Sequence, residues 1–479
     1  MSDAPTYTSA LATRYASPAM VALWGDAHRA RLWRRLWLAL AEEERRLGVD
    51  IPERAIAEMR AHLDDADLER ARSHERRLRH DVMAHIHHFG EQAPAARPYI
   101  HLGATSAYVT DNADLLVLRE VLGRLLGRLG AVLQGLRDFA QRHRELPTVA
   151  YTHFQPAQLT TVGKRATLWL QDFALDAAAL KDVVGTLPFR GCKGTTGTQA
   201  SFLELFGGDH AKVRQLDARV AAAFEFPESI AVSGQTYTRK IDSRVLDALA
   251  GIAQSASKFA TDLRLLQHEG ELLEPAEADQ VGSSAMPYKR NPMRAERVSG
   301  LARYLISLRE NTAYTAATQW LERTLDDSAN RRLVLPEASL AADAILILVT
   351  NIVAGLDVRA ETIRRNVERV MPFMATERWL MLAVQAGGDR QAVHEVIRRH
   401  SRAVSADVER GAPNDLLDRL SRDPAFARVD AAALRGELEP RRYVGRAPEQ
   451  VVEYLEGPVK SLLTSLSGFA VRDDATVTV

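Results

Sequence analysis

Residues 115–139 have the sequence LLVLREVLGRLLGRLGAVLQGLRDF, in which apolar residues recur at alternating steps of three and four. The recurring positions are Leu115, Leu118, Leu122, Leu125, Leu129, Val132, Leu136 and Phe139. This spacing puts one apolar stripe along a single α-helix of about seven turns. A stripe of that length has to be buried against other long helices, so the stretch predicts a helical bundle.

Three later stretches have the same spacing and extend the prediction over the centre of the chain. Apolar residues recur at helical steps over 162–180, over 245–266 and over 298–308. No strand-like alternation separates these stretches. We therefore predict an all-α fold with a central bundle of long helices. Because a seam of this length usually also meets a partner subunit, we expect a homo-oligomer.

The length of the chain indicates more than one domain. A chain of 479 residues is too long for one compact core. The helical patterns before the central bundle and after it are shorter than those inside it. We predict three helical domains, with bounds 1–105, 106–358 and 359–479. The polar tail after about residue 471 is expected to be frayed.

The charge balance and the N-terminal sequence argue against nucleic-acid-binding and membrane proteins. Lys plus Arg and Asp plus Glu number 62 each, so no overall charge attracts nucleic acid or an anionic membrane. Residues 1–18 lack the apolar core of a secretory signal. The longest apolar stretch, 344–356, is shorter than the roughly 20 residues that span a bilayer. The single cysteine, Cys192, suits a reducing compartment, and we expect a cytoplasmic protein.

A basic cluster near the N-terminus has two interpretations. It consists of Arg31, Arg34 and Arg35, interleaved with the apolar residues Leu32, Trp33, Leu36, Trp37 and Leu40. Such a cluster can bind nucleic acid, or it can be the solvated face of a helix whose other face is buried. The interleaved apolar residues favour the solvated face.

Four segments between the helical patterns are rich in Gly, Ser, Thr, His and Arg, and reactive groups are expected there. They are residues 79–81, 101–106, 151–156 and 282–292. The last has the sequence GSSAMPYKRNP, with Asn291 suited to cap a helix that starts at Pro292. The helix end, together with Lys289, could bind an anion. An ordinary capped loop explains the same residues equally well.

This last segment resembles the G-S-S-x-M-P-x-K-x-N signature of the fumarase/aspartase superfamily, whose members eliminate fumarate from a succinyl group. Where this chain has Tyr288, argininosuccinate lyases typically have Gln and fumarases Gly. Tyr288 instead matches the adenylosuccinate lyase family, and the resemblance to its animal-type branch runs almost from end to end. The further matching blocks are residues 79–85, 151–165, 193–199, 234–240 and 322–332.

The resemblance implies a base, an acid and an anion clamp for an elimination. Ser283 matches the general base, His153 the general acid, and His80 a second active-site histidine. The residues that match the clamp for the substrate carboxylates are Thr105, Ser106, Thr152, Gln235, Lys289 and Asn291. Those that match the phosphate pocket are Arg14, Tyr15, Arg297, Arg323, Ser328 and Arg332, and Arg79 and Asp81 flank His80 as further substrate-binding residues.

The family resemblance also implies a homotetramer in which several chains contribute to each site, and it implies no cofactor and no metal. In the run of His80, His85, His87 and His88, the step from His80 to His85 is not the i, i+4 spacing of a helical metal-binding pair. The implied reaction releases fumarate from adenylosuccinate and from the succinylated imidazole-carboxamide ribotide. Two alternatives remain open: an argininosuccinate lyase, whose substrate has no phosphate, and a structural protein that has kept the fold and lost the activity.

Overall fold

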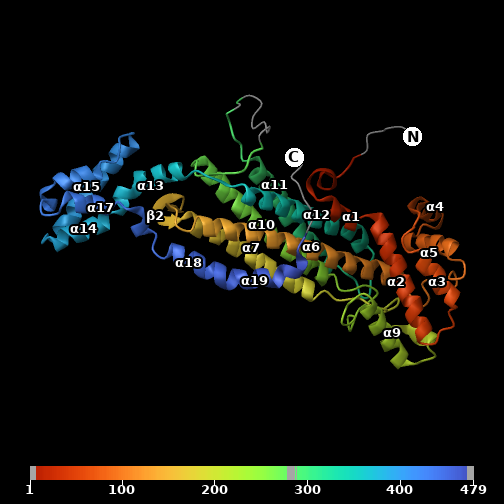
Figure 1. The fold of residues 1–479 in the computed structure, drawn as a ribbon. Coiled ribbons are helices and arrows are strands. Elements are labelled where there is room, and N and C mark those ends of the chain that lie inside the picture. Colours follow the sequence, from red (N-terminus) through yellow and green to blue (C-terminus); the bar gives the residue numbers. More distant parts are fainter. Residues whose placement is uncertain (1–6, 278–285, 287, 472–479) are drawn as a thin grey trace.

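The computed structural model describes residues 7–277, 286 and 288–471 as an elongated helical molecule built around five long helices (Figure 1). The five helices are α6 (Ser106–Arg142), α7 (Val162–Gly185), α10 (Lys240–His268), α11 (Met293–Ala317) and α12 (Asp326–Ala354). The predicted all-α fold with a central bundle of long helices is confirmed.

The apolar stripe of α6 is the centre of the core. All eight of its recurring residues are at most 3% exposed. The helix packs against α7 on one side and α12 on another, and α10 packs against α7, α11 and α12. Because each fully buried Leu contributes roughly 1.5–3 kcal/mol, this stripe is a large part of what holds the bundle together.

Shorter helices precede the bundle. They are η1 (Leu11–Tyr15), α1 (Pro18–Leu23), α2 (Asp26–Arg46), α3 (Glu53–Ala61), α4 (Leu68–Leu78) and α5 (Asp81–Gln92). The predicted solvated basic face on α2 is wrong for Arg34, which is 1% exposed. Its guanidinium donates to Asp65 at 3.0 Å and to Gln92 at 2.6 Å, and it lies 4.7 Å from the centre of the Phe89 ring. These partners allow a charged group to be buried there.

Two small antiparallel sheets were not predicted. The hairpin of β1 (Pro147–Thr152) and β2 (Gln155–Thr161) connects α6 to α7, and β3 (Leu272–Leu273) pairs with β4 (Asp357–Val358). The first four residues of β2 are exposed, so this strand has no buried face over that stretch to indicate it in the sequence. Between α7 and α10 lie two short helices, α8 (Ala200–Leu205) and α9 (His210–Ala223).

The C-terminal helices divide into two groups. The first group has a small apolar core of its own, which includes Trp379, Val404 and Phe426, and lies at one end of the bundle (Figure 1). It consists of α14 (Thr376–Gln385), α15 (Arg390–Glu409), α16 (Leu416–Arg422) and α17 (Ala431–Gly436), and α13 (Ala360–Met374), whose buried residues belong to the main core, leads into it. The second group, α18 (Ala447–Tyr454) and α19 (Lys460–Leu466), packs on α7 and α6 respectively. The three-domain division stays a prediction.

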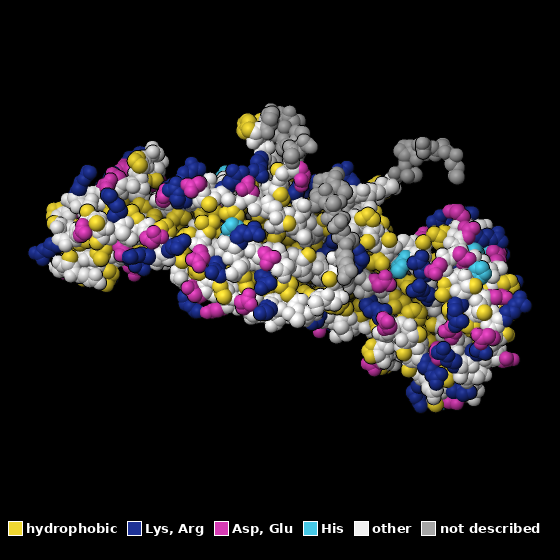
Figure 2. Space-filling model, viewed as in Figure 1, with side chains coloured by type: hydrophobic (Ala, Val, Ile, Leu, Met, Phe, Trp, Pro, Cys, Tyr) yellow, Lys and Arg dark blue, Asp and Glu magenta, His cyan; other side chains and the backbone are white. Residues whose placement is uncertain are grey.

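The visible surface agrees with the balanced charge of the sequence, whereas the most apolar helix is longer than the apolar stretch 344–356 that the sequence indicated. On the visible face, basic and acidic side chains are interspersed, without a large area of one sign (Figure 2). Among the described residues one helix, α12, is long and apolar enough to span a bilayer. Because 78% of its most apolar window is buried inside the protein, α12 is a core helix.

Glu44 on α2 makes the stability of the fold depend on pH. It is fully buried, and neither carboxylate oxygen has a hydrogen-bond partner among the residues described. Burial raises the pKa of Glu44 to about 9 from an ordinary value of 4.5. In the fold the carboxyl therefore keeps a proton that the unfolded chain has lost, so its contribution to stability is intact below pH 4.5 and declines as the pH rises toward 9.

Glu44→Gln should therefore stabilise the protein by about 2–4 kcal/mol at pH 8 and have little effect at pH 4.5. The measurement is urea unfolding of both proteins at the two pH values. Glu228→Gln, at an exposed position, is the control and should change neither curve. An equal effect of Glu44→Gln at both pH values would show that the carboxyl is not protonated in the fold.

Candidate functional site

His80 and Ser106 meet at the end of the bundle where α5 and α6 begin. His80 is the N-cap of α5, and its Nδ1 accepts a hydrogen bond from the Met83 N–H at 3.3 Å. The other ring nitrogen, Nε2, lies 3.5 Å from Oγ of Ser106, the first residue of α6. Thr105 is the N-cap of α6, and Arg79 precedes His80 in the left-handed conformation, with φ 58°. The structure thus brings these four predicted residues together.

Asp81 and Arg332 join the starts of α5 and α12 at the same place. A guanidinium N–H of Arg332 donates to the Asp81 carboxylate at 2.7 Å. Burial acts to raise the pKa of Asp81, but the hydrogen bond from Val82 and the charge of Arg332 outweigh it, so the pKa lies below its ordinary value. Asp81 is therefore ionised at neutral pH.

A buried charge network fixes the segment that contains Gln235. The Arg239 guanidinium, 1% exposed, donates to Asp111 of α6 at 3.1 Å and to Asp327 of α12 at 2.7 Å. Its charge lies 4.5 Å from the centre of the Tyr237 ring. Removing one partner from such a buried network costs about 3–5 kcal/mol, so the network holds its segment firmly.

Gln235 itself links three of the predicted blocks. Its backbone N–H donates to the Glu322 carbonyl and its side-chain amide to the Thr195 carbonyl, both at 3.0 Å. Arg323 lies 3.8 Å from Asp327, and Ser328 is in the first turn of α12. One end of the bundle therefore holds nine of the predicted site residues. They are Arg79, His80, Asp81, Thr105, Ser106, Gln235, Arg323, Ser328 and Arg332.

Thr152 and His153 lie at the opposite end of the bundle, on the β1–β2 hairpin. The two turn residues, His153 and Phe154, have φ angles of 53° and 57°. Such two-residue turns normally contain Asn or Gly, because a side chain raises the energy of this conformation. The turn exposes His153 to solvent.

The length of α6 separates the two histidines. The helix has 37 residues, or about 55 Å at 1.5 Å per residue, and His80 lies near its first residue while His153 follows its last. A single chain therefore cannot bring His80 and His153 to one substrate. Any site that uses both must combine different copies of the chain.

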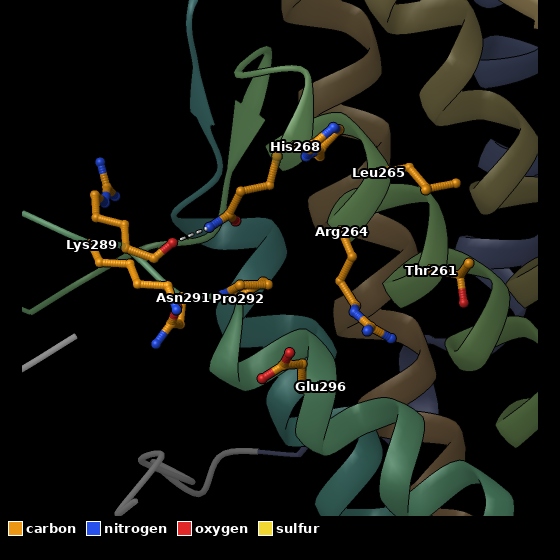
Figure 3. A pocket seen from close by; sticks show the side chains of 10 residues that line it. Thr261, Arg264, Leu265, His268, Lys289, Asn291, Pro292 and Glu296 are labelled. Carbon is orange, nitrogen blue, oxygen red and sulfur yellow. Dashed lines mark hydrogen bonds between the residues drawn. The ribbon is translucent and has the colours of Figure 1, made fainter. Parts of the chain in front are cut away.

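Lys289 and Asn291 line a cavity of about 490 Å³ where α10 ends and α11 begins (Figure 3). The lining residues are Thr261, Arg264, Leu265, Gln267, His268, Lys289, Arg290, Asn291, Pro292 and Glu296. Gln235 precedes the other end of α10, which is 29 residues or about 43 Å long. Ser283, the predicted base, lies outside the described residues.

The predicted helix cap at Asn291 is wrong. Helix α11 begins at Met293 with Pro292 in the N-cap position, and Pro292 makes no side-chain cap. The N–H groups of Arg294 and Ala295 instead donate to the two carboxylate oxygens of Glu274, each at 3.0 Å. A carboxylate already occupies this helix end, so these two N–H groups are not open to a substrate anion.

Arg14, Tyr15 and Arg297 form a third group, along the side of the bundle. The Arg297 guanidinium lies 5.7 Å from the centre of the Tyr15 ring. The short η1 that contains Arg14 and Tyr15 packs against α12. The Ser17 N–H anchors the following turn on α12 by donating to Asp343 at 2.8 Å.

Comparisons with known proteins cover nearly the whole chain. A family model described as "Lyase" matches residues 51–306, and one described as "Adenylosuccinate lyase C-terminus" matches residues 372–454. The adenylosuccinate lyase of Saccharomyces cerevisiae is 48% identical over 97% of both chains. That of Schizosaccharomyces pombe is 46% identical over 97% of this chain and 98% of its own. The chain belongs to the adenylosuccinate lyase family.

Solved structures support the fold of this adenylosuccinate lyase family member. A fumarate lyase from Mesorhizobium sp. BNC1 superposes with a TM-score of 0.79 at 24% identity, covering 95% of this chain and all of that one. The 3-carboxy-cis,cis-muconate lactonizing enzyme from Pseudomonas putida superposes with a TM-score of 0.80 at 22% identity, covering 96% and 99%. The long-helix bundle is therefore shared with enzymes whose sequences have diverged widely.

His101 is a candidate site residue of this adenylosuccinate lyase family member that the sequence did not single out. It has φ 72°, and its Nδ1 accepts a hydrogen bond from the Trp37 indole N–H at 2.8 Å. Burial, assisted by the charge of His80, lowers the pKa of His101 to about 4. The ring is therefore neutral at pH 7, and its proton is on Nε2 because Nδ1 is the acceptor. Its position in the 101–106 segment was the available signal.

Proposed function

We propose that this chain eliminates fumarate from adenylosuccinate to give AMP, and from the succinylated imidazole-carboxamide ribotide to give the carboxamide ribotide. It is a lyase that acts on a carbon–nitrogen bond. The observation that carries the proposal is the 48% identity to the yeast adenylosuccinate lyase over nearly the full length of both chains. The substrates are small molecules of purine nucleotide synthesis, and the proposed location is the cytoplasm.

In the proposed mechanism Ser283 removes the proton from the carbon next to a substrate carboxylate, and His153 protonates the departing nitrogen. An imidazole suits the second step because it can hold and release a proton near neutral pH. Negative charge builds up on the carboxylate as the proton leaves. Donors that bind this charge lower the barrier, and we assign this task to Thr105, Ser106, Thr152, Gln235, Lys289 and Asn291.

The nucleotide phosphate has a separate binding site in this proposal. Arginine suits phosphate because its planar fork can donate two hydrogen bonds at once. The assigned residues are Arg14, Tyr15, Arg297, Arg323, Ser328 and Arg332. The contact between Arg297 and Tyr15 and the position of Arg323 near Asp327 support two separate arginine groups that different chains would bring together. We assign His80, with Arg79 and Asp81, to substrate orientation. No step requires a cofactor or a metal.

The site would be assembled from several copies of the chain in a homotetramer. The separation of about 55 Å along α6 between the His80 and His153 ends supports this arrangement. In a closed symmetric assembly, each chain can contribute one end to one site and the other end to another. A monomer would then have no complete site.

The direct test is fumarate release by the purified protein. We expect turnover of adenylosuccinate and of the succinylated ribotide, and none of argininosuccinate, which has no phosphate for the arginines to bind. Turnover of argininosuccinate alone would overturn the proposed substrate. Absence of turnover with all three, despite AMP binding, would favour the structural protein that has lost its activity.

A further inference from the structure

The side-chain amide of Gln267, in the last turn of α10, joins two segments that flank the signature sequence. Its oxygen accepts a hydrogen bond from the backbone N–H of Glu274 at 3.2 Å. Its nitrogen donates to the backbone carbonyl of Arg290 at 2.9 Å. The Gln267 side chain is therefore hydrogen-bonded to the backbone at Glu274, before the signature, and to the backbone at Arg290, between Lys289 and Asn291 near the end of the signature.

Glu274 makes a second connection between the same two segments. Its side chain is almost fully buried, and its two carboxylate oxygens accept the N–H groups of Arg294 and Ala295 in the first turn of α11. Its backbone carbonyl accepts a hydrogen bond from the Arg290 guanidinium at 3.2 Å. This connection makes three hydrogen bonds between the two segments.

The rigid part of the fold holds Glu274 in place. The preceding residues, Leu272 and Leu273, form β3 and pair with β4 after the end of α12. A Cβ added to Gly355 would lie 2.6 Å from the Cβ of Pro275, so this close approach requires glycine. Arg290 is held in addition by Asp357 of β4 at 3.3 Å. The anchoring points therefore belong to α10, α12 and β4, and not to the signature itself.

We propose that Gln267 and Glu274 are positioning residues for the reaction: they fix the segment 288–292 against α10 and α11, and so set the places of Lys289 and Asn291 in the cavity. This inference rests on the proposed function in one respect: it takes the substrate carboxylate to be the group that Lys289 and Asn291 bind. Neither Gln267 nor Glu274 resembles a reactive group of the family, and neither is assigned contact with substrate.

The position of a charged donor matters strongly for catalysis. A displacement of about 1 Å from the productive geometry can cost a factor of about 100 in rate. Loss of the Gln267 amide would remove the hydrogen bond that ties the Arg290 carbonyl to α10, and would leave this segment held through the Arg290 side chain by Glu274 and Asp357. Of the arginines assigned to the phosphate, Arg14 lies on η1, Arg297 lies in the second turn of α11, and Arg323 and Arg332 lie just before α12 and near its start. Loss of either positioning residue should therefore lower kcat and leave the affinity for AMP nearly unchanged.

The experiment compares Gln267→Ala and Glu274→Ala with wild type in kcat, KM and AMP affinity. We expect kcat to fall about 10- to 100-fold in both variants, with the Kd for AMP and the tetramer content unchanged within about twofold. Glu274→Gln keeps one of the two acceptor oxygens and should lie between wild type and Glu274→Ala. Gln254→Ala, at an exposed position on the same helix, is the matched control and should behave as wild type.

Limited trypsin digestion provides a readout that needs no substrate. Cleavage after Lys289 and Arg290 should be at least about fivefold faster in Gln267→Ala than in wild type or Gln254→Ala, because the segment is released from α10. Unchanged kcat together with unchanged cleavage would overturn the inference. A parallel loss of kcat, AMP binding and tetramer content would also overturn it, because that pattern indicates a general structural role. If wild type releases no fumarate, the proposed function fails, and the digestion result still decides the inference.

Discussion

Replacing Ser283 with Ala should lower kcat for adenylosuccinate by about 10²–10⁴-fold, the usual contribution of a positioned general base. The Kd for AMP should change less than about threefold, because the phosphate pocket does not include this residue. The measurement is steady-state fumarate release combined with calorimetric titration of AMP. Replacement of a hydroxyl by hydrogen removes the proton acceptor without adding bulk, so the loss would report on chemistry.

The neighbouring Ser284 provides the control for this prediction. Ser284→Ala makes the same chemical change one residue further along the chain. Its kcat for adenylosuccinate should be higher than that of Ser283→Ala. If Ser284→Ala abolishes turnover while Ser283→Ala does not, the base has been assigned to the wrong serine. If neither change matters, the proton acceptor belongs to another residue altogether.

Mixed tetramers of two inactive variants should regain activity. His80→Ala and His153→Ala each remove a residue from one end of the bundle, and every site of a uniform tetramer then lacks that residue. If a site takes its His80 and His153 from different chains, random mixing at equal ratio leaves about a quarter of the sites with both histidines. Co-expression with two affinity tags and purification through both would isolate such tetramers for the fumarate assay.

The matched control mixes His153→Ala with His153→Gln. These variants share the same defect, so no arrangement of chains can rebuild a site. Recovery in this control would reveal residual activity of one variant. Failure of the His80 and His153 pair to recover, in tetramers proven to contain both chains, would contradict a site shared between copies.

The sequence was most informative where a single helix pattern continues over many turns. The stripe on α6 predicted its burial correctly at all eight positions, since no other regular structure buries residues at that spacing. It failed where long-range contacts decide the outcome. Arg34 is buried because Asp65, in the loop between α3 and α4, and Gln92, at the end of α5, contact it, and nothing within α2 indicates those partners.

The candidate site could be predicted as a set of residues but not as an arrangement. The signature and the matching blocks indicated which residues belong to the site. They did not indicate which residues pair, because a pair such as Arg332 and Asp81 joins positions 251 residues apart. The hairpin that presents His153 has short strands, and the first four residues of β2 are exposed, so the sequence indicates these strands only weakly. The cap on α11 comes from Glu274 rather than from Asn291, because the buried Glu274 carboxylate accepts the N–H groups of Arg294 and Ala295 in the first turn.

The continuous length of α6 has a consequence for how the active centres of the proposed tetramer would influence one another. In that assembly, a stiff helix with predicted substrate-binding residues beside both ends would make each chain a member of two centres. A small tilt produced when one centre binds its ligand displaces the far end in proportion to the helix length. Occupancy of one centre should thus alter the affinity of the next, and by reciprocity the second should alter the first equally.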